Sequence, residues 1–464
     1  MTIKKLKILG FRGFSSEQSI EFSAPNGTDN GSGLTIITGA NNSGKSSIIE
    51  CLKARNSSQS PSFSVGSRNP KLDSVEIEYT VGEKIERITS LKKGSSETTK
   101  ANYDANFQIF VLPSRRSFSP FFSKGYNNRQ QYTISDGLQP LRSPSINNFH
   151  QRLFTIEKDP EKFNQILYEV LDFKPDWSID QTDQGQHFLK FYNGNYSHTS
   201  DGMGEGIINI FSIVDSLYDS KPGDVVAIDE PELSLHPSLQ KKVFHLFNKY
   251  SRDRQIIIST HSPYFIDIRS ILNGANIVRV TNQGNGTEIF QMNEESKKII
   301  NELTTGNLYN PHILGLNAKE LFFLEEKIII LEGQEDVLLF PKISEQLNIE
   351  LTASFFGWGA GGAGNISKIC SLLKNLGFKK VAAILDGNKL NTVPGLEKFF
   401  PDYHFCSICA DDIRTKSEKK SSPAVNGLLD KDLNIINKYK EKTYTLFSDL
   451  NIYMNKKIET GQKI

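Results

Sequence analysis

Gly39-Ala40-Asn41-Asn42-Ser43-Gly44-Lys45-Ser46-Ser47 is the stretch that decides the fold, because it matches the phosphate-loop pattern G-x-x-x-x-G-K-[ST]. Residues 34–38 before it form a β-branched apolar run, which is typical of a buried strand. Residues 46–53 after it have the apolar spacing of a helix. A loop between a strand and a helix turns its amides and the helix N-terminus towards an anion. The stretch therefore predicts a nucleoside triphosphate site; the alternative is a Gly/Ser-rich connection without a ligand.

Two side chains of this loop have specific roles in the predicted site. Lys45 places a compact positive charge near the outer phosphates, and Ser46 offers its hydroxyl to Mg²⁺. The rest of the predicted nucleotide contacts come from the same loop, namely Gly39, Asn41, Asn42, Ser43, Gly44 and Ser47.

Two later apolar strands also end in polar clusters. Residues 224–232 end in Asp-Glu-Pro-Glu, and residues 255–263 contain Ser-Thr-His-Ser after an apolar run. Open α/β sheets bind ligands at the carboxyl ends of their strands. We therefore expect Asp229 to hold Mg²⁺ and Glu230 to polarise the attacking water. We expect His261 to donate a hydrogen bond to the γ-phosphate or to position that water.

Two neighbouring features have a second interpretation. Glu232 lies one residue too far along to share the roles of the two acids before it, so we expect it to cap the following helix. The turn Ser200-Asp201-Gly202 leads into an apolar helix and has a phosphate-cradling pattern. Glycine-rich helix starts are common, but this turn also lies between the two nucleotide motifs in the chain.

The composition is that of an ordinary globular protein. A chain of 464 residues is too long for one core, and 37% hydrophobic with 23% charged residues fits two or three folded domains. No apolar run approaches the roughly 20 residues that cross a bilayer, so we expect no membrane span. The chain has only four cysteines, too few for a disulfide scaffold, which indicates a reducing cytoplasm. Two of them form a C-x-x-C, but no second pair and no histidine partner follows, so we do not expect a zinc site. With a net charge of +1, any nucleic-acid contact must come from local patches.

The rest of the N-terminal region is predicted from shorter patterns. A strand or a hairpin is expected within residues 3–22, and helices are expected within residues 150–175. Residues 75–79, 84–90 and 107–112 predict a small antiparallel sheet beside the nucleotide site.

In this order, the phosphate loop, the Ser-x-Gly turn and the two strand ends resemble an ABC-type ATPase head, with SMC-like heads as the nearest type. The resemblance implies an α/β domain with a mixed sheet, flanking helices and a helical lobe. It also implies ATP as cofactor, with two ATP molecules buried between paired heads, and hence a homodimer or higher homo-oligomer. In such a pair Ser200 and Gly202 contact the γ-phosphate of the partner's nucleotide. Residues 56–199 lack the sustained heptads of an SMC coiled coil.

A second strand–helix–strand pattern begins at residue 326. Its first strand ends in Glu332, and its second strand ends in Asp386. Repetition of this kind predicts a parallel sheet, with both carboxylates at the same edge. Oxygen ligands of this kind hold Mg²⁺ or Mn²⁺, which can polarise a phosphodiester. Further predicted metal ligands are Asp336, Asn388, Asp411 and Asp412, although a solvated turn is an equal alternative for the last two.

This second module is smaller than the first and resembles a TOPRIM domain. The TOPRIM pattern is Glu-Gly at the end of one strand and Asp-x-Asp at the end of the next. Asn388 stands at the second Asp of that pattern. An ABC-type ATPase followed by TOPRIM resembles the overcoming lysogenization defect (OLD) family of ATP-dependent nucleases. That resemblance implies DNA cleavage and a role in anti-phage defence. The predicted domains are 1–325, with an inserted lobe at about 113–195, and 326–464, with a lysine-rich C-terminal extension.

Asn388 keeps other functions open, because a neutral amide is a weaker metal ligand than a carboxylate. One alternative is an ATP-driven switch or scaffold, whose degenerate TOPRIM module docks a partner protein or RNA and cuts nothing. Another alternative is a nuclease that a second protein or an RNA holds silent.

Overall fold

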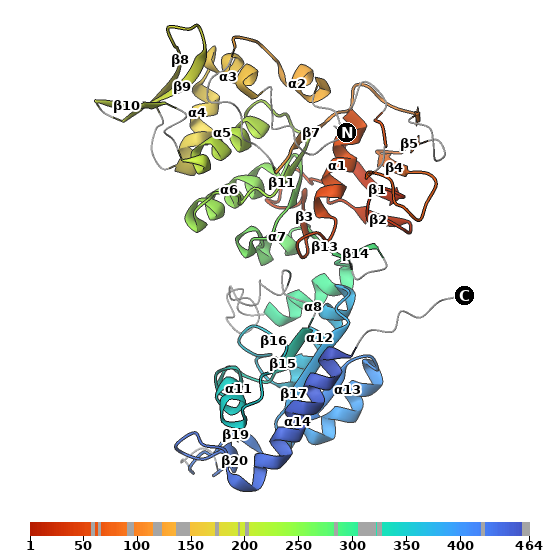
Figure 1. Cartoon of the computed structure of the whole chain (residues 1–464), viewed down its shortest axis with the longest axis vertical. Coiled ribbons are helices and arrows are strands. Elements are labelled where there is room, and N and C mark those ends of the chain that lie inside the picture. Colours follow the sequence, from red (N-terminus) through yellow and green to blue (C-terminus); the bar gives the residue numbers. More distant parts are fainter. Residues whose placement is uncertain are drawn as a thin grey trace. The chain divides into compact units, whose positions relative to one another are not determined.

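A computed structural model gives the fold of the chain (Figure 1). It describes residues 1–56, 61–63, 66–90, 97–114, 123–135, 149–171, 176–193, 195–199, 204–282, 286–304, 322, 327–418 and 423–456. The chain forms two units, Met1–Gln291 and Met292–Ile464, which are described separately. The division falls earlier than the boundary after residue 325 that the sequence suggested. The reason is that α8 (Glu294–Thr304) packs on α12 (Ile366–Asn375) of the second unit.

The central sheet of the first unit carries all three nucleotide motifs that the structure describes. Its strand order is β14-β13-β3-β12-β11-β7, and β13, β3, β12, β11 and β7 are mutually parallel. Every residue of β3, β11 and β12 is buried, which explains their uninterrupted apolar sequences. Since these three strands are neighbours, their motifs lie at one edge of the sheet (Figure 1). The strands are β3 (Leu34–Thr38), β7 (Ile109–Leu112), β11 (Val225–Asp229), β12 (Gln255–Ser259), β13 (Asn276–Asn282) and β14 (Thr287–Gln291).

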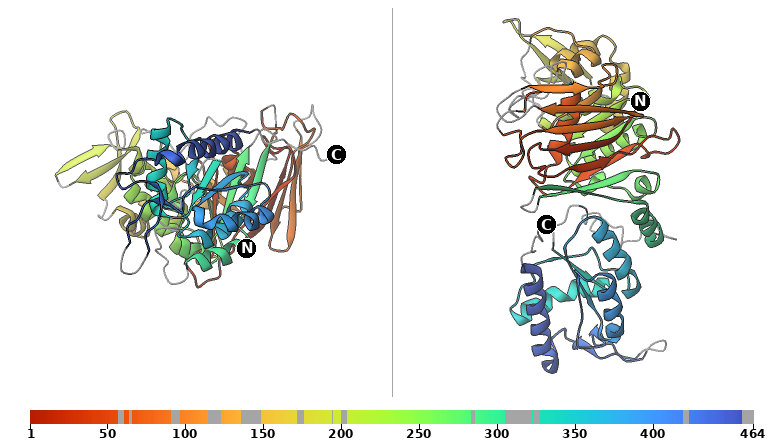
Figure 2. Two further views of the ribbon diagram at one scale, coloured as in Figure 1. Left: turned by 90° about the horizontal axis from the view of Figure 1, so that it is seen from below. Right: turned by 90° about the vertical axis from the view of Figure 1, so that its right-hand side faces the viewer.

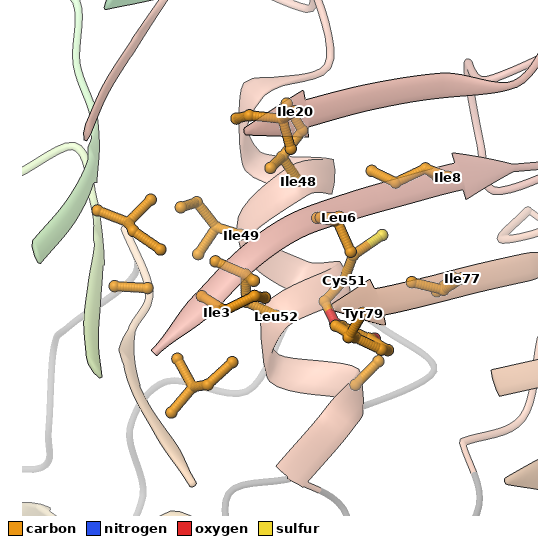
Figure 3. Close-up of a cluster of buried hydrophobic side chains, with 14 of the residues drawn as sticks. Ile3, Leu6, Ile8, Ile20, Ile48, Ile49, Cys51, Leu52, Ile77 and Tyr79 are labelled. Carbon is orange, nitrogen blue, oxygen red and sulfur yellow. The ribbon is translucent and has the colours of Figure 1, made fainter. Parts of the chain in front are cut away.

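A second sheet of the first unit is antiparallel, in the order β2-β1-β4-β5-β6. Helix α1 (Lys45–Asn56), which follows the phosphate loop, packs its apolar side chains on this sheet (Figure 3). There Ile48, Ile49 and Leu52 of the helix lie among Ile3 and Leu6 of β1 (Figure 3). The strands are β1 (Ile3–Leu9), β2 (Gln18–Glu21), β4 (Glu76–Val81), β5 (Lys84–Ser90) and β6 (Thr98–Ala101).

The prediction for residues 107–112 was wrong. Strand β7 does not join the antiparallel sheet but pairs in parallel with β11. All four of its residues are buried, because it contacts α1, α2 (Arg129–Ser135) and α5 (Glu205–Tyr218). A short apolar run of this kind fits a parallel sheet covered by helices.

The inserted region forms a lobe with helices where residues 150–175 predicted them, and with a three-stranded sheet that the sequence did not predict. Arg152 is fully buried, and its Nη2 lies 2.9 Å from Asp215 Oδ1, which ties α3 to α5. The lobe and the following helices are α3 (Phe149–Glu157), α4 (Glu161–Leu171), β8 (Asp176–Gln181), β9 (His187–Asn193), β10 (Tyr196–Thr199), α6 (Pro237–Tyr250), η2 (Pro263–Phe265) and α7 (Ile268–Leu272).

The second unit contains the predicted parallel sheet, in the order β16-β15-β17-β18. Helices α11 and α14 cover one face, where the rings of Phe340 and Phe447 stack 5.8 Å apart. Figure 2 shows α12 and α13 on the other face. The remaining elements are β15 (Lys327–Leu331), α11 (Gln334–Leu347), β16 (Ser354–Phe355), η3 (Ala363–Asn365), β17 (Lys380–Leu385), η4 (Gly387–Thr392), α13 (Val393–Phe399), β18 (His404–Ser407), β19 (Asp412–Arg414), β20 (Gly427–Leu429) and α14 (Asn437–Asn455).

Part of the lysine-rich extension forms the helix α14. It buries Phe447 and Leu450 and exposes Lys438, Lys440 and Lys442. Among the helices that the structure describes, none combines the length and the apolarity needed to cross a lipid bilayer.

Candidate functional site

The phosphate loop has a backbone that only a few residue types adopt. Gly39 has φ of +143°, Gly44 has +116° and Asn42 has +60°. A Cβ at Gly39 would lie 2.1 Å from the carbonyl oxygen of Val280, so this position requires glycine. Side chains of the loop differ in exposure: Asn41 and Asn42 are exposed, Ser46 is half-buried, and Ser43 and Ser47 are buried.

Lys45 lies across its own loop. Its Nζ donates hydrogen bonds to the carbonyl oxygens of Gly39 and Ala40, each at 3.0 Å. Burial lowers the pKa of Lys45 to about 8, and the nearby carboxylates of Glu230 and Asp229 act in the opposite direction. The ammonium is therefore mostly charged at neutral pH and available to a phosphate group at this edge of the sheet.

The two strand ends beside Lys45 meet through their backbones and side chains. Asp229 accepts a hydrogen bond from the Ser259 hydroxyl. Glu230, with φ of +49°, donates its backbone N–H to the Ser259 carbonyl at 2.8 Å. Its Oε1 lies 3.6 Å from His261 Nε2. Burial and the Lys45 charge lower the pKa of His261, so the imidazole is neutral at neutral pH. Glu230 and His261 thus lie side by side at the ends of the two strands.

Glu232 does not cap the following helix, contrary to the prediction. The N-cap of α6 is His236, whose side chain accepts the N–H of Ser238. Glu232 instead accepts the backbone N–H of His261 at 2.5 Å, and burial raises its pKa. It therefore holds the His261 loop in place. The prediction failed because a helix cap can be inferred from local sequence spacing, whereas the contact between Glu232 and His261 joins two strand ends that are distant in the chain.

The Ser-x-Gly turn is not part of this geometry, because Ser200 and Gly202 lie outside the described residues. Helix α5 begins just after the turn, as expected. Its first turn lies close to the segment after β11, since a Cβ at Gly206 would be 2.6 Å from the Ser234 carbonyl oxygen.

In the second unit, Glu332 and Asp386 follow the neighbouring parallel strands β15 and β17, as predicted. The backbone N–H of Asp386 donates to Glu332 Oε1 at 2.8 Å, so the two residues are adjacent. Asp336 lies in the first turn of α11, where its Oδ2 accepts the Gly333 N–H at 2.8 Å.

Negative charge is concentrated at these strand ends. Burial, followed by the charges of Asp336, Glu332 and Asp412, raises the pKa of Asp386 to about 7. Burial and the charges of Glu332, Asp412 and Glu335 raise the pKa of Asp336 to about 6, against the opposing Gly333 hydrogen bond. Mutual repulsion among oxygen ligands is the situation that a divalent cation relieves.

These carboxylates fit a metal by their chemistry, but they are not already arranged around one. Across the described part of the chain, no group of three or more His, Cys, Asp or Glu side chains is poised to hold an ion. Binding would therefore require the carboxylates to rotate, which half-buried side chains at strand ends can do.

The other predicted ligands divide into two groups. Asn388 is exposed, and its Nδ2 donates to the Asp411 carbonyl at 2.9 Å, so Asp411 contributes its backbone there. Asp412 belongs to the acidic cluster and pairs with Lys416 at 2.6 Å. Glu335 was not predicted from the sequence, although its carboxylate pairs with Arg414 at 2.6 Å and with Lys416 at 3.2 Å. Its position beside Asp336 at the helix start was the available signal.

Several curated proteins are similar to the chain. Septu protein PtuA of Bacillus thuringiensis is 25% identical over 312 residues, covering 58% of this chain and 74% of PtuA. The Old nuclease of Escherichia phage P2 is 28% identical over 162 residues, covering 34% of this chain and 27% of that nuclease. The OLD nuclease of Thermus scotoductus is 27% identical over 279 residues, covering 57% of this chain and 50% of the relative. The chain thus spans half or less of the two nucleases.

Among solved structures, the SMC head domain from Thermotoga maritima is similar, with a TM-score of 0.39 and 15% identity over 63% of this chain and 100% of that one.

Two family models match separate parts of the sequence. The description "AAA domain, putative AbiEii toxin, Type IV TA system" matches residues 34–267, which hold the phosphate loop and both strand ends. The description "Overcoming lysogenization defect protein-like, TOPRIM domain" matches residues 323–387, which include Glu332 and Asp386. This is the domain pair of a hydrolase, an ATPase domain followed by a nuclease-type domain. Because the match to the AAA domain covers just over half of the 464 residues, the chain belongs to this family of AAA ATPase domains, and an OLD-like TOPRIM domain follows in the sequence.

Proposed function

We propose that this protein is an ATP-hydrolysing, metal-dependent DNA endonuclease. The observation that carries the proposal is the gathering of carboxylates at two separate strand edges. The charges of Asp229 and Glu230 act on the buried Lys45 in the first unit, and Glu332 adjoins Asp386 in the second. One edge lies in the AAA domain and the other in the OLD-like TOPRIM domain.

In the ATPase domain, the loop amides and Lys45 would bind the triphosphate. Ser46 and Asp229 would hold Mg²⁺, which neutralises phosphate charge when bound. Glu230 is the general base, because its carboxylate lies 3.6 Å from His261 Nε2 at the strand ends, where it could take a proton from a bound water. Neutral His261 carries one ring N–H, which can donate to that water or to the γ-phosphate.

In the TOPRIM domain, Glu332, Asp336, Asp386 and Asp412 would hold Mg²⁺ or Mn²⁺. A cation bound there polarises a phosphodiester and stabilises the leaving oxygen. Lys416 pairs with Asp412 of this group and Arg414 pairs with the neighbouring Glu335, and both cations can receive the DNA phosphates. DNA is the proposed substrate, since two similar proteins are named as nucleases.

A homodimer or larger homo-oligomer completes the proposed ATPase site. Ser200 and Gly202 of one subunit would contact the γ-phosphate bound by another, as the resemblance to ABC-type heads implies. The resemblance to the OLD family suggests a role against phage, and the few cysteines suggest action in the cytoplasm.

A scaffold without nuclease activity is the second candidate. The observation in its favour is the engagement of the Asn388 amide with the Asp411 backbone, at the place where the TOPRIM pattern has an aspartate. Under this alternative the protein hydrolyses ATP and cuts no DNA.

Assays of purified wild type, Lys45→Ala and Glu332→Ala decide between the two candidates. ATP turnover and plasmid nicking are measured with Mg²⁺ and with Mn²⁺. We expect Lys45→Ala to lose ATP binding, and Glu332→Ala to keep ATP turnover and lose nicking. Nicking by Glu332→Ala at the wild-type rate would disprove the nuclease assignment. ATP turnover without nicking in the wild type, whichever metal is present, would favour the scaffold or the nuclease that a second protein or an RNA holds silent.

Metal affinity of the TOPRIM site is expected to rise with pH. A cation binds the ionised carboxylates, so the protons on Asp386 and Asp336, whose pKa values are about 7 and about 6, must first leave. Between pH 5.5 and 7, the affinity for Mn²⁺ should increase by about tenfold per pH unit for each proton that is released. Above pH 7 the affinity should level off. Calorimetric Mn²⁺ titration of the nucleotide-free protein measures this. A pH-independent affinity would contradict the proposed ligands.

A further inference from the structure

The phosphate loop is braced by a residue that the sequence motifs did not indicate. Thr287, the first residue of β14, is only 2% exposed. Its Oγ1 donates a hydrogen bond to the carbonyl oxygen of Ser43 at 3.2 Å, and its backbone N–H donates to the carbonyl oxygen of Gly13 at 2.7 Å. Thr287 therefore joins the loop to the turn after β1.

The contact depends on the absence of side chains on both sides of Thr287. A Cβ at Gly44 would lie 2.8 Å from Thr287 Cγ2, and a Cβ at Gly13 would lie 2.3 Å from Thr287 Oγ1. Either added carbon would push Thr287 away from the loop backbone. Both glycines thus allow the threonine to approach closely enough for its hydroxyl to reach Ser43.

The direction of this hydrogen bond has a consequence for phosphate binding. In a trans peptide the C=O and the N–H of one unit point in opposite directions. With the Ser43 carbonyl held towards Thr287, the N–H of Gly44 points to the other side of the loop. Backbone N–H groups of a phosphate loop are the groups that bind phosphate oxygens.

We propose that Thr287 is a positioning residue for the nucleotide, whose hydroxyl fixes the Ser43–Gly44 peptide so that the Gly44 N–H donates to a phosphate oxygen. This inference rests on the proposed nucleotide site. Without the hydroxyl, the buried Ser43 carbonyl loses its partner and the peptide is free to turn. A hydrogen bond of this kind changes an equilibrium by roughly 2- to 10-fold, and the turned peptide also removes a phosphate contact. We expect the Kd for nucleotide to rise about tenfold.

The test compares three variants. Thr287→Val keeps the shape and removes the hydroxyl, and Thr287→Ser keeps the hydroxyl and removes the methyl group. Thr281→Val is the matched control, because Thr281 lies in the neighbouring strand, is 4% exposed, and its Oγ1 has no hydrogen-bond partner among the described residues. The Kd of a fluorescent ATP analogue and the unfolding temperature without nucleotide are measured for each full-length protein.

The expected result is about tenfold weaker binding by Thr287→Val alone, with Thr287→Ser and Thr281→Val within about twofold of wild type. Equal affinity of Thr287→Val and wild type would overturn the inference. So would an equal loss in Thr281→Val, or failure of the serine variant to restore binding, because both would indicate packing as the cause. Absence of binding by the wild type would instead overturn the nucleotide site itself.

Discussion

Replacing Glu230 with glutamine is expected to lower the rate of ATP hydrolysis by about 10²- to 10³-fold, with the affinity for ATP within about twofold of wild type. The amide has the same shape as the carboxylate but cannot take a proton from water. The strained backbone is held by the hydrogen bond from the Glu230 N–H to the Ser259 carbonyl, which the substitution leaves intact. Steady-state turnover together with equilibrium binding of ATP measures the two quantities separately.

Glu232→Gln is the matched control for this prediction. Glu232 is two residues along and half-buried, and an amide oxygen can still accept the His261 N–H. We expect its turnover to stay within about tenfold of wild type, since no proton transfer depends on it. If Glu232→Gln abolishes turnover and Glu230→Gln does not, the roles of the two glutamates are reversed.

Replacing Asp386 with asparagine is expected to lower metal-dependent DNA cleavage by at least about 10³-fold, without changing ATP turnover. Asp386 adjoins Glu332 at the strand end, and its amide counterpart supplies no negative charge to a cation. The control is Glu345→Gln, which removes one charge from the exposed face of α11 away from the strand ends. Cleavage by Asp386→Asn at the rate of that control would exclude Asp386 from the metal site.

Stability provides a second measure for the same variant. Because the pKa of Asp386 is raised to about 7, the fold disfavours its ionised form. The stability that this group contributes is present below its unfolded pKa and is lost as pH rises through about 7. Metal-free Asp386→Asn should therefore unfold at a higher temperature than wild type at pH 8, and this difference should shrink as the pH is lowered to 5. A lower unfolding temperature at pH 8 would mean that lost cleavage reflects damage to the fold.

Local sequence patterns predicted the parts of the site that follow buried strands. The runs before Gly39, at 225–229 and before His261 are apolar without alternation, as in a covered parallel sheet, and this placed their polar ends at one edge. The same reasoning placed Glu332 beside Asp386. These predictions required only that the strands are buried and run parallel to one another.

Contacts between distant segments could not be predicted in this way. The short run 109–112 is apolar enough for either kind of sheet, and only packing against helices selects its partner β11. Glu232 follows a cap-like spacing, but the His261 N–H is the stronger partner. Thr287 reaches Ser43 across 244 positions of sequence, and no periodicity encodes such a contact.

Anomalous scattering from crystals soaked with Mn²⁺ and a non-hydrolysable ATP analogue locates the cations themselves, and so shows whether both acidic strand ends bind metal. We expect one peak beside Ser46 and Asp229 in contact with the triphosphate, and another between the side chains of Glu332 and Asp386. Triphosphate density in the loop without a peak at either acidic strand end would contradict this expectation.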